Sequence, residues 1–199
     1  MPRDAEATKQ RIFDAASAEF AEQGLAGARV DRIAARAEAN KQLIYAYYGN
    51  KEELFAEVLA RQLEELAEEI TIDPERLAEY AGRLLDFHAE HPEVTRLIMH
   101  EALHYGDREV PMEERRRAHN AAKVEAVARA QREGIVAPGI DPRDIVMFVI
   151  GYAIWCAAMP PTLRMFEGGD PNTPEARARR RESFEEAVRR IVRTASDRQ

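Results

Sequence analysis

Apolar residues recur along the chain at three- and four-residue spacing, which is the period of amphipathic helices. In the first such segment Ile12, Ala16 and Phe20 share one face, and Gly24 predicts its end. No segment has the convincing alternation of apolar and polar residues that marks a strand. Because glycines and prolines separate the helical segments, we predict an all-α protein of about nine helices.

Each predicted helix is defined by its apolar stripe and by the residues that begin and end it. A head of three helices comes first, and six further helices follow. The predicted ranges are 5–23, 29–37, 41–47, 51–70, 74–90, 93–105, 112–133, 142–159 and 175–194. Asn40 is a good N-cap for the third helix. We therefore expect an N-terminal domain at residues 1–50 and a C-terminal domain at residues 51–199.

Residues 31–54 contain two short helices joined by a tight turn at residues 38–40. A helix of this length fits the major groove of DNA, and the side chains of its first turn reach the base edges. Those side chains are Lys41, Gln42 and Leu43. Lysine and glutamine can hydrogen-bond to purine edges, and leucine can contact a thymine methyl group. Double-stranded DNA is therefore the predicted partner of this segment.

Tyrosines and a lysine follow the predicted groove-facing turn. Tyr45 and Tyr47 lie two positions apart, so they point in different directions and can contact phosphates beside the groove. Lys51 adds a cation and free backbone N–H groups at the start of the next helix. Tyr48 is predicted to lock the third helix onto the first. The alternative is an ordinary helical hairpin with solvated side chains, but packing does not require this combination of residues.

The chain has a net charge of −7, which argues against binding of nucleic acid over its whole surface. The head is near neutral and the remainder acidic, which fits local DNA contact by a few placed cations. A single cysteine, Cys156, cannot form an internal disulfide, and the N-terminus lacks the apolar region of a signal peptide. We therefore predict a cytoplasmic protein. The apolar run 145–159 is shorter than the roughly 20 residues of a membrane span, which predicts a helix buried on nearly every side and no membrane partner.

The first 55 or so residues resemble the TetR family of bacterial transcription regulators. The residues that carry the resemblance, which covers about residues 8–55, are Ala16, Phe20, Gly24, Val30, Ile33, Ala34, Ala37, Asn40, Lys41, Ile44, Tyr45, Tyr48, Lys51, Glu52 and Leu54. The resemblance implies a homodimeric repressor whose heads enter successive major grooves of a palindromic operator. It also implies that a small-molecule ligand releases the repressor from DNA.

By position, the resemblance implies DNA-contacting roles for eight residues: Arg29, Asn40, Lys41, Gln42, Leu43, Tyr45, Tyr47 and Lys51. The chain departs from the family pattern at three places. Ala28 and Arg29 stand where a Thr or Ser cap precedes the second helix. Glu38 replaces the turn glycine and must adopt the backbone conformation of the turn. Ala39 replaces a valine, which thins the contact between the second and third helices.

Aromatic, methionine and histidine side chains are frequent in the predicted helices of residues 74–159. Such a set suits an apolar pocket with a few polar anchors, although core packing explains any single member. The predicted lining consists of Tyr80, Phe87, His88, Met99, His100, Leu103, Met147, Tyr152 and Trp155. The predicted effector is lipophilic and neutral or cationic. The resemblance also implies dimer contact through helices 142–159 and 175–194.

His100, Glu101 and His104 match the H-E-x-x-H pattern of zinc proteases. The pattern fixes only three positions, and its extended form requires a glycine and a histidine where the chain has Asp107 and Val110. We therefore expect no enzyme activity, no metal and no cofactor. A zinc hydrolase is one alternative function, and a ligand-independent DNA binder or activator is another.

Overall fold

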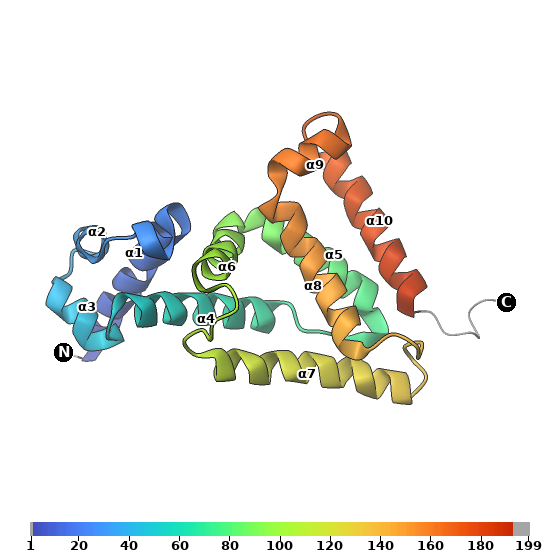
Figure 1. Ribbon diagram of the computed structural model, residues 1–199, viewed down its shortest axis with the longest axis horizontal. Coiled ribbons are helices and arrows are strands. Elements are labelled where there is room, and N and C mark those ends of the chain that lie inside the picture. The colour runs from blue at the N-terminus through green and yellow to red at the C-terminus, as the bar shows by residue number, and fades with distance from the viewer. Residues whose placement is uncertain (1, 193–199) are drawn as a thin grey trace. The chain divides into compact units, whose positions relative to one another are not determined.

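The computed structural model describes residues 2–192, and these residues form ten α-helices, one 3-10 helix and no strand (Figure 1). The helices are α1 (Pro2–Gly27), α2 (Val30–Arg36), α3 (Lys41–Tyr48), α4 (Lys51–Glu69), α5 (Leu77–Glu90), α6 (Pro92–Tyr105), α7 (Glu113–Arg132), α8 (Pro142–Ala158), α9 (Pro160–Glu167) and α10 (Pro174–Val192). The 3-10 helix η1 (Pro74–Arg76) precedes α5. The predicted all-α class is confirmed.

Two helices differ from the sequence-based expectation. The helix α9 was not predicted, because Pro160 and Pro161 suggested only the end of the preceding helix. Proline is well tolerated in the first turn of a helix, where its missing N–H has no intrahelical partner, and α9 begins there. The helix α1 continues to Gly27 but breaks at Gly24, whose φ of 66° is not helical. The predicted stop at Gly24 therefore marks a kink in the backbone.

The described residues form two compact units. The first contains the chain up to Leu66 together with Glu93–Arg116, and the second contains Ala67–Pro92 and the chain from Arg117 onward. The division into domains near residue 50 stays a prediction. Large apolar side chains from α1, α4 and α6 build the core of the first unit, among them Ile12, Phe20, Phe55 and Leu97. The rings of Phe20 and Phe55 meet edge to face, with their centroids 5.1 Å apart.

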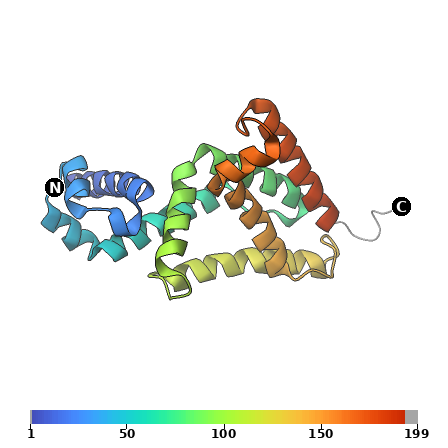
Figure 2. The same cartoon turned by 45° about the horizontal axis from the view of Figure 1, so that its top comes forward.

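In the second unit α5 packs against both α8 and α10 (Figure 2). Phe184 of α10 lies against Tyr152 of α8, with ring centroids 4.3 Å apart. The prediction that helix 142–159 is buried on nearly every side is wrong for the single chain, because Met147 is 62% and Phe148 42% exposed. The helical period fixes which residues share a face, but not whether another helix covers that face.

Among the described residues no single helix has the length and apolar composition to cross a membrane, although α8 and α9 together pass that test as a pair bent by 90°.

Candidate nucleic-acid interface

The segment from α2 to α3 forms a helix-turn-helix with a well-defined turn (Figure 1). Ile33 of α2 and Ile44 of α3 point into the core of the first unit and are 0% and 1% exposed. Glu38 adopts a φ of 50°, so this residue takes the left-handed conformation that the turn requires. The side chain of Asn40 accepts a hydrogen bond from the backbone N–H of Gln42 at 2.8 Å, which confirms the predicted N-cap of α3.

Much of the surface of α3 away from the core is polar and open to solvent. Lys41, Gln42 and Tyr45 are exposed, and Leu43 is half-buried. The helix is therefore oriented by its buried side, and the side chains of its first turn remain available to a partner. Together with the exposed Tyr45, this arrangement supplies donors at the positions that a groove-binding helix uses.

The ammonium group of Lys41 is held by a carboxylate of the preceding helix. Its Nζ lies 2.8 Å from Oδ1 of Asp31 in the first turn of α2. The hydrogen bond to Asp31 raises the pKa of Lys41 above its ordinary value. The lysine therefore carries its full charge at neutral pH and has a fixed acceptor beside it.

The other predicted phosphate contacts also have partners within the first unit. Lys9 lies over the ring of Tyr47, with Nζ 5.4 Å from the centroid, and the hydroxyl of Tyr48 donates to the carbonyl of Lys9 at 3.1 Å. The prediction that Tyr48 locks α3 onto α1 is thus confirmed. Nζ of Lys51 is 3.4 Å from the carbonyl oxygen of Ala28, just before α2. Tyr45, which is 44% exposed, is more open to a partner than the half-buried Tyr47.

A buried glutamate anchors the start of α2, which has no hydroxyl cap. Arg29 occupies the N-cap position and makes no side-chain capping bond. Its backbone N–H instead donates to Oε1 of Glu19 at 3.0 Å, and Nε of Arg32 donates to the same oxygen at 2.7 Å. Glu19 was not identified from the sequence. Its position could have indicated a buried carboxylate, because Glu19 directly precedes Phe20 and lies on the side of α1 that also carries Ala15 and Ala16.

The nine residues predicted to line an effector pocket lie in both units. Met99, His100 and Leu103 belong to the first unit and the other six to the second. Leu103 is 78% and Met147 62% exposed, while Tyr80, Phe87 and His88 are buried along α5. Tyr152 is half-buried and Trp155 is 37% exposed. Their role in ligand binding stays a prediction.

Burial controls the titration of two members of this set. It raises the pKa of Tyr80 to about 12. It also lowers the pKa of His88 to about 4, with a smaller contribution from His91. Both side chains are therefore uncharged at neutral pH.

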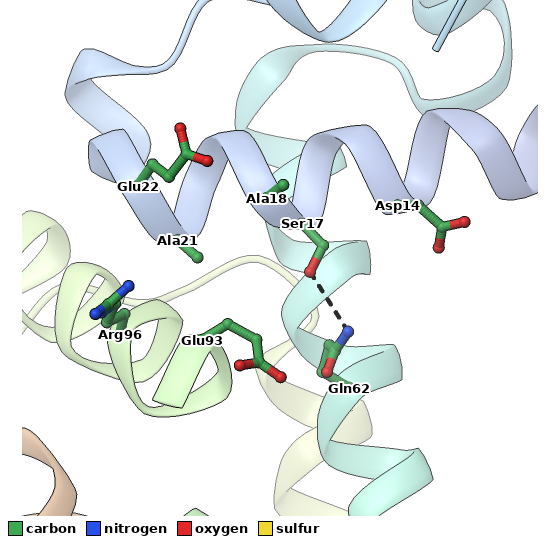
Figure 3. Close-up of a pocket in the computed structure, with 8 residues that line it drawn as sticks. All are labelled: Asp14, Ser17, Ala18, Ala21, Glu22, Gln62, Glu93 and Arg96. Carbon is green, nitrogen blue, oxygen red and sulfur yellow. Dashed lines mark hydrogen bonds between the residues drawn. The ribbon is translucent and has the colours of Figure 1, made fainter. Parts of the chain in front are cut away.

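A cavity of about 400 Å³ in the first unit has a lining that does not overlap the predicted set (Figure 3). Helices α1, α4 and α6 contribute its walls: Asp14, Ser17, Ala18, Ala21, Glu22, Gln62, Glu93 and Arg96. Gln62 of α4 is 3.4 Å from the hydroxyl of Ser17 on α1, as the dashed line in Figure 3 shows. The polar character of this cavity contrasts with the apolar pocket that the sequence suggested.

The H-E-x-x-H residues lie on α6, and their central glutamate has another partner. Both carboxylate oxygens of Glu101 accept hydrogen bonds from Nη1 of Arg116, at 2.6 and 2.7 Å. The ring of His104 packs edge to face on Tyr105. Within residues 2–192, no three His, Cys, Asp or Glu side chains are grouped so that they could hold a metal ion. The motif is therefore accounted for by helix packing and an ion pair.

Comparison with known proteins gives matches over both parts of the chain. The family model described as "Bacterial regulatory proteins, tetR family" matches residues 12–58. A second model, "Tetracyclin repressor-like, C-terminal domain", matches residues 76–190. The HTH-type transcriptional repressor SCO4008 of Streptomyces coelicolor is 48% identical over 191 residues, which cover 96% of this chain and 97% of that protein. The HTH-type transcriptional repressor NicS of Pseudomonas putida is 33% identical over 111 residues, or 52% of each chain.

Solved structures agree with these matches. The crystal structure of SCO4942 from Streptomyces coelicolor superposes with a TM-score of 0.79 at 36% sequence identity, and the match covers 93% of this chain and 98% of that one.

Proposed function

The chain belongs to the TetR family of bacterial regulatory proteins, and from this membership we propose how it binds DNA and how it is released. It is a DNA-binding transcriptional repressor of the helix-turn-helix type. A repressor relative that matches almost the whole chain supports this assignment. A bacterial regulator that acts on DNA works in the cytoplasm, where its single buried thiol stays reduced.

The observation that carries the proposed DNA contact is the orientation of α3. Its buried Ile44 fixes the helix on the core, and Lys41, Gln42 and Tyr45 are exposed to solvent. Lys41, Gln42 and Leu43 then contact base edges, and Tyr45 contacts phosphate. The remaining phosphate contacts come from Arg29, Tyr47 and Lys51 at the rim, while Asn40 acts through its capping bond.

The proposed assembly is a homodimer that places two heads in successive major grooves, about 34–36 Å apart. Exposed apolar residues on α8 support a contact through this helix, with α10 beside it. Met147, Gly151 and Trp155 recur every four residues and form a stripe that solvent does not favour. A Cβ added at Gly151 meets no atom within 4 Å, so a partner helix can approach closely there.

We propose that the protein has two conformations, one that fits the operator and one that does not. Release from DNA requires a ligand that binds the second conformation better than the DNA-bound one. The proposed effector is a lipophilic small molecule held between helices of the C-terminal part. Tyr80, Phe87 and His88, which are uncharged and buried along α5, support an apolar site.

Selection of bound sequences from a pool of random duplex DNA tests the proposal. We expect recovery of a palindrome with half-sites one helical turn apart. Recovery of no shared sequence would contradict an operator-binding repressor. A reporter gene placed behind the recovered operator then separates repression from activation, because a repressor lowers its expression.

A further inference from the structure

The cationic side chains of the helix-turn-helix are paired with carboxylates of the head. Arg32 pairs with Glu19 at 2.7 Å, and Arg36 pairs with Glu22 at 3.1 Å. Lys41 has its own carboxylate, on Asp31. Residues 1–50 contain seven Lys or Arg and seven Asp or Glu, so the whole net charge of −7 lies beyond residue 50. The head therefore lacks the excess positive charge that draws proteins to any DNA sequence.

The pair between Lys41 and Asp31 differs from the other two because it lies at the groove-facing end of α3. Lys41 is in the first turn of α3 and Asp31 in the first turn of α2. Their side chains are 43% and 74% exposed, whereas the carboxylate that holds Arg32 is buried. A partner that approaches the start of α3 therefore meets an ammonium group and a carboxylate together.

The chemistry of this pair favours a base edge over a phosphate. An ammonium group has three donors, and the bond to Asp31 uses one of them. The two free donors match the adjacent O6 and N7 acceptors that guanine presents in the major groove. A phosphate at the same place would meet the negative charge of Asp31 and be repelled.

Given the proposed DNA binding through α3, we propose that Asp31 is a specificity-determining residue. Its carboxylate orients the Lys41 ammonium toward a guanine in each half-site. The same carboxylate keeps the ammonium from contacting the phosphates of unrelated DNA. Exposed ion pairs are weak, so the pair directs the lysine without blocking it. Asp31 acts through Lys41 and is a positioning residue for that contact.

The test compares the full-length protein with Asp31→Asn, which removes the charge and keeps the shape. Binding is measured against the selected operator and against an unrelated duplex of equal length, over a series of salt concentrations. We expect Asp31→Asn to bind the unrelated duplex about 1.5- to 5-fold more tightly per protomer at low salt. The slope of log affinity against log salt becomes steeper by about 0.9 per protomer, because one more phosphate contact forms. The affinity for the operator divided by the affinity for the unrelated duplex falls. The preference for guanine at the contacted position becomes weaker.

Two control variants distinguish the effect of the Lys41–Asp31 ion pair from the effect of a change in net charge. Glu68→Gln removes the same charge from an exposed position on α4 outside the head, and it should leave both slope and ratio unchanged. In a Lys41→Gln background, Asp31→Asn should have a smaller effect, limited to the direct repulsion between the carboxylate and phosphate, because there is no ammonium group to release.

An unchanged slope and ratio for Asp31→Asn would overturn the role of Asp31. The same holds if the full shift persists without Lys41, or if Glu68→Gln reproduces it. Failure of the wild-type protein to select any sequence would instead refute the proposed function itself, and the role of Asp31 with it. Melting curves of each variant, followed by circular dichroism, separate lost folding from lost binding.

Discussion

Oε1 of Glu19 lies 2.7 Å from Nε of Arg32, and the glutamate that makes this bond is 1% exposed. The same oxygen accepts the backbone N–H of Arg29 at the start of α2. Glu19 thus joins α1 to the first turn of the helix-turn-helix. In this chain an acidic side chain from another helix accepts the backbone N–H of the N-cap residue, which is the bond that the glutamate of a capping box makes.

Replacement of this glutamate tests the joint between α1 and α2. Glu19→Ala leaves the N–H of Arg29 and the guanidinium of Arg32 without their acceptor. We expect a loss of about 1–3 kcal/mol in the free energy of unfolding and weaker operator binding. Glu19→Gln keeps an acceptor and should lose less. Urea unfolding followed by circular dichroism measures both.

The control for this prediction is Glu22→Ala. Glu22 is on α1 like Glu19, and its ion pair with Arg36 of α2 is more exposed. Its cost should stay within about 0.5 kcal/mol. Equal losses for Glu19→Ala and Glu22→Ala would show that the buried cap has no special importance.

Gly24 and His100 give a second prediction. Gly24 has a φ of 66°, and a Cβ at this position would lie 2.7 Å from Nδ1 of His100. Gly24→Ala should therefore suffer both a side-chain clash and a backbone conformation (φ 66°, ψ 173°) that is open essentially to glycine alone, at about 1–3 kcal/mol. Gly168→Ala is a reference for a positive φ without a clash, because Gly168 has a φ of 67°, a ψ of 11° and no atom within 4 Å of an added Cβ. Thermal unfolding should show a larger loss for Gly24→Ala than for Gly168→Ala.

The clash can be removed independently. In a His100→Ala background, Gly24→Ala should cost less than it does in the wild type, because only the backbone cost remains. An equal cost in both backgrounds would show that His100 of α6 does not press on the kink of α1.

The lowered pKa of His88 predicts that the stability of the protein depends on pH. Its folded-state pKa is about 4, against an ordinary value of 6.5. The unfolded chain therefore binds a proton on this residue as the pH falls below 6.5, while the folded chain does not until about 4. Stability should be greatest above 6.5 and fall by up to about 3 kcal/mol as the pH approaches 4.

Urea unfolding at several pH values measures this dependence, with His88→Gln as the test variant. The variant should lose the contribution of His88 between pH 6.5 and 4. Parallel curves for wild type and His88→Gln would rule out the buried neutral histidine.

The exposed stripe of α8 predicts how the chain associates. Met147→Asp places a charge at a position that is 62% exposed in the single chain, so it should be tolerated by the fold and disrupt a dimer contact. Analytical ultracentrifugation should find a dimer for the wild type and a monomer for the variant. Leu103→Asp alters a residue of α6 that is 78% exposed and should remain dimeric. A dimeric Met147→Asp would exclude this face of α8 as the contact.

The sequence predicted the features of the helix-turn-helix that depend on local chemistry. The cap at Asn40 follows from the chemistry of its neighbouring residues. The special turn conformation at Glu38 was implied by the resemblance to a family that has a glycine there. The packing of Tyr48 on α1 was predicted from its aromatic side chain at the end of the third helix. Such features need only the identity and spacing of residues that are close in the chain.

Contacts between helices could not be predicted in the same way. Glu19 and Arg32 are thirteen positions apart, and Asp31 and Lys41 are ten apart, so both pairs depend on how the helices pack. Composition favoured Leu103 as a pocket residue, yet it is mostly exposed. The helical period identifies an apolar face, but the element that covers it is determined by the tertiary fold.

The most direct test of DNA binding through α3 is the affinity of a Lys41→Ala/Gln42→Ala/Tyr45→Ala variant for the selected operator, measured by fluorescence anisotropy. All three side chains are on the exposed face of α3, so the variant should keep the melting temperature of the wild type. We predict that its operator affinity falls at least about 100-fold, since each lost contact costs about 1–3 kcal/mol. Wild-type affinity in a folded triple variant would contradict the account.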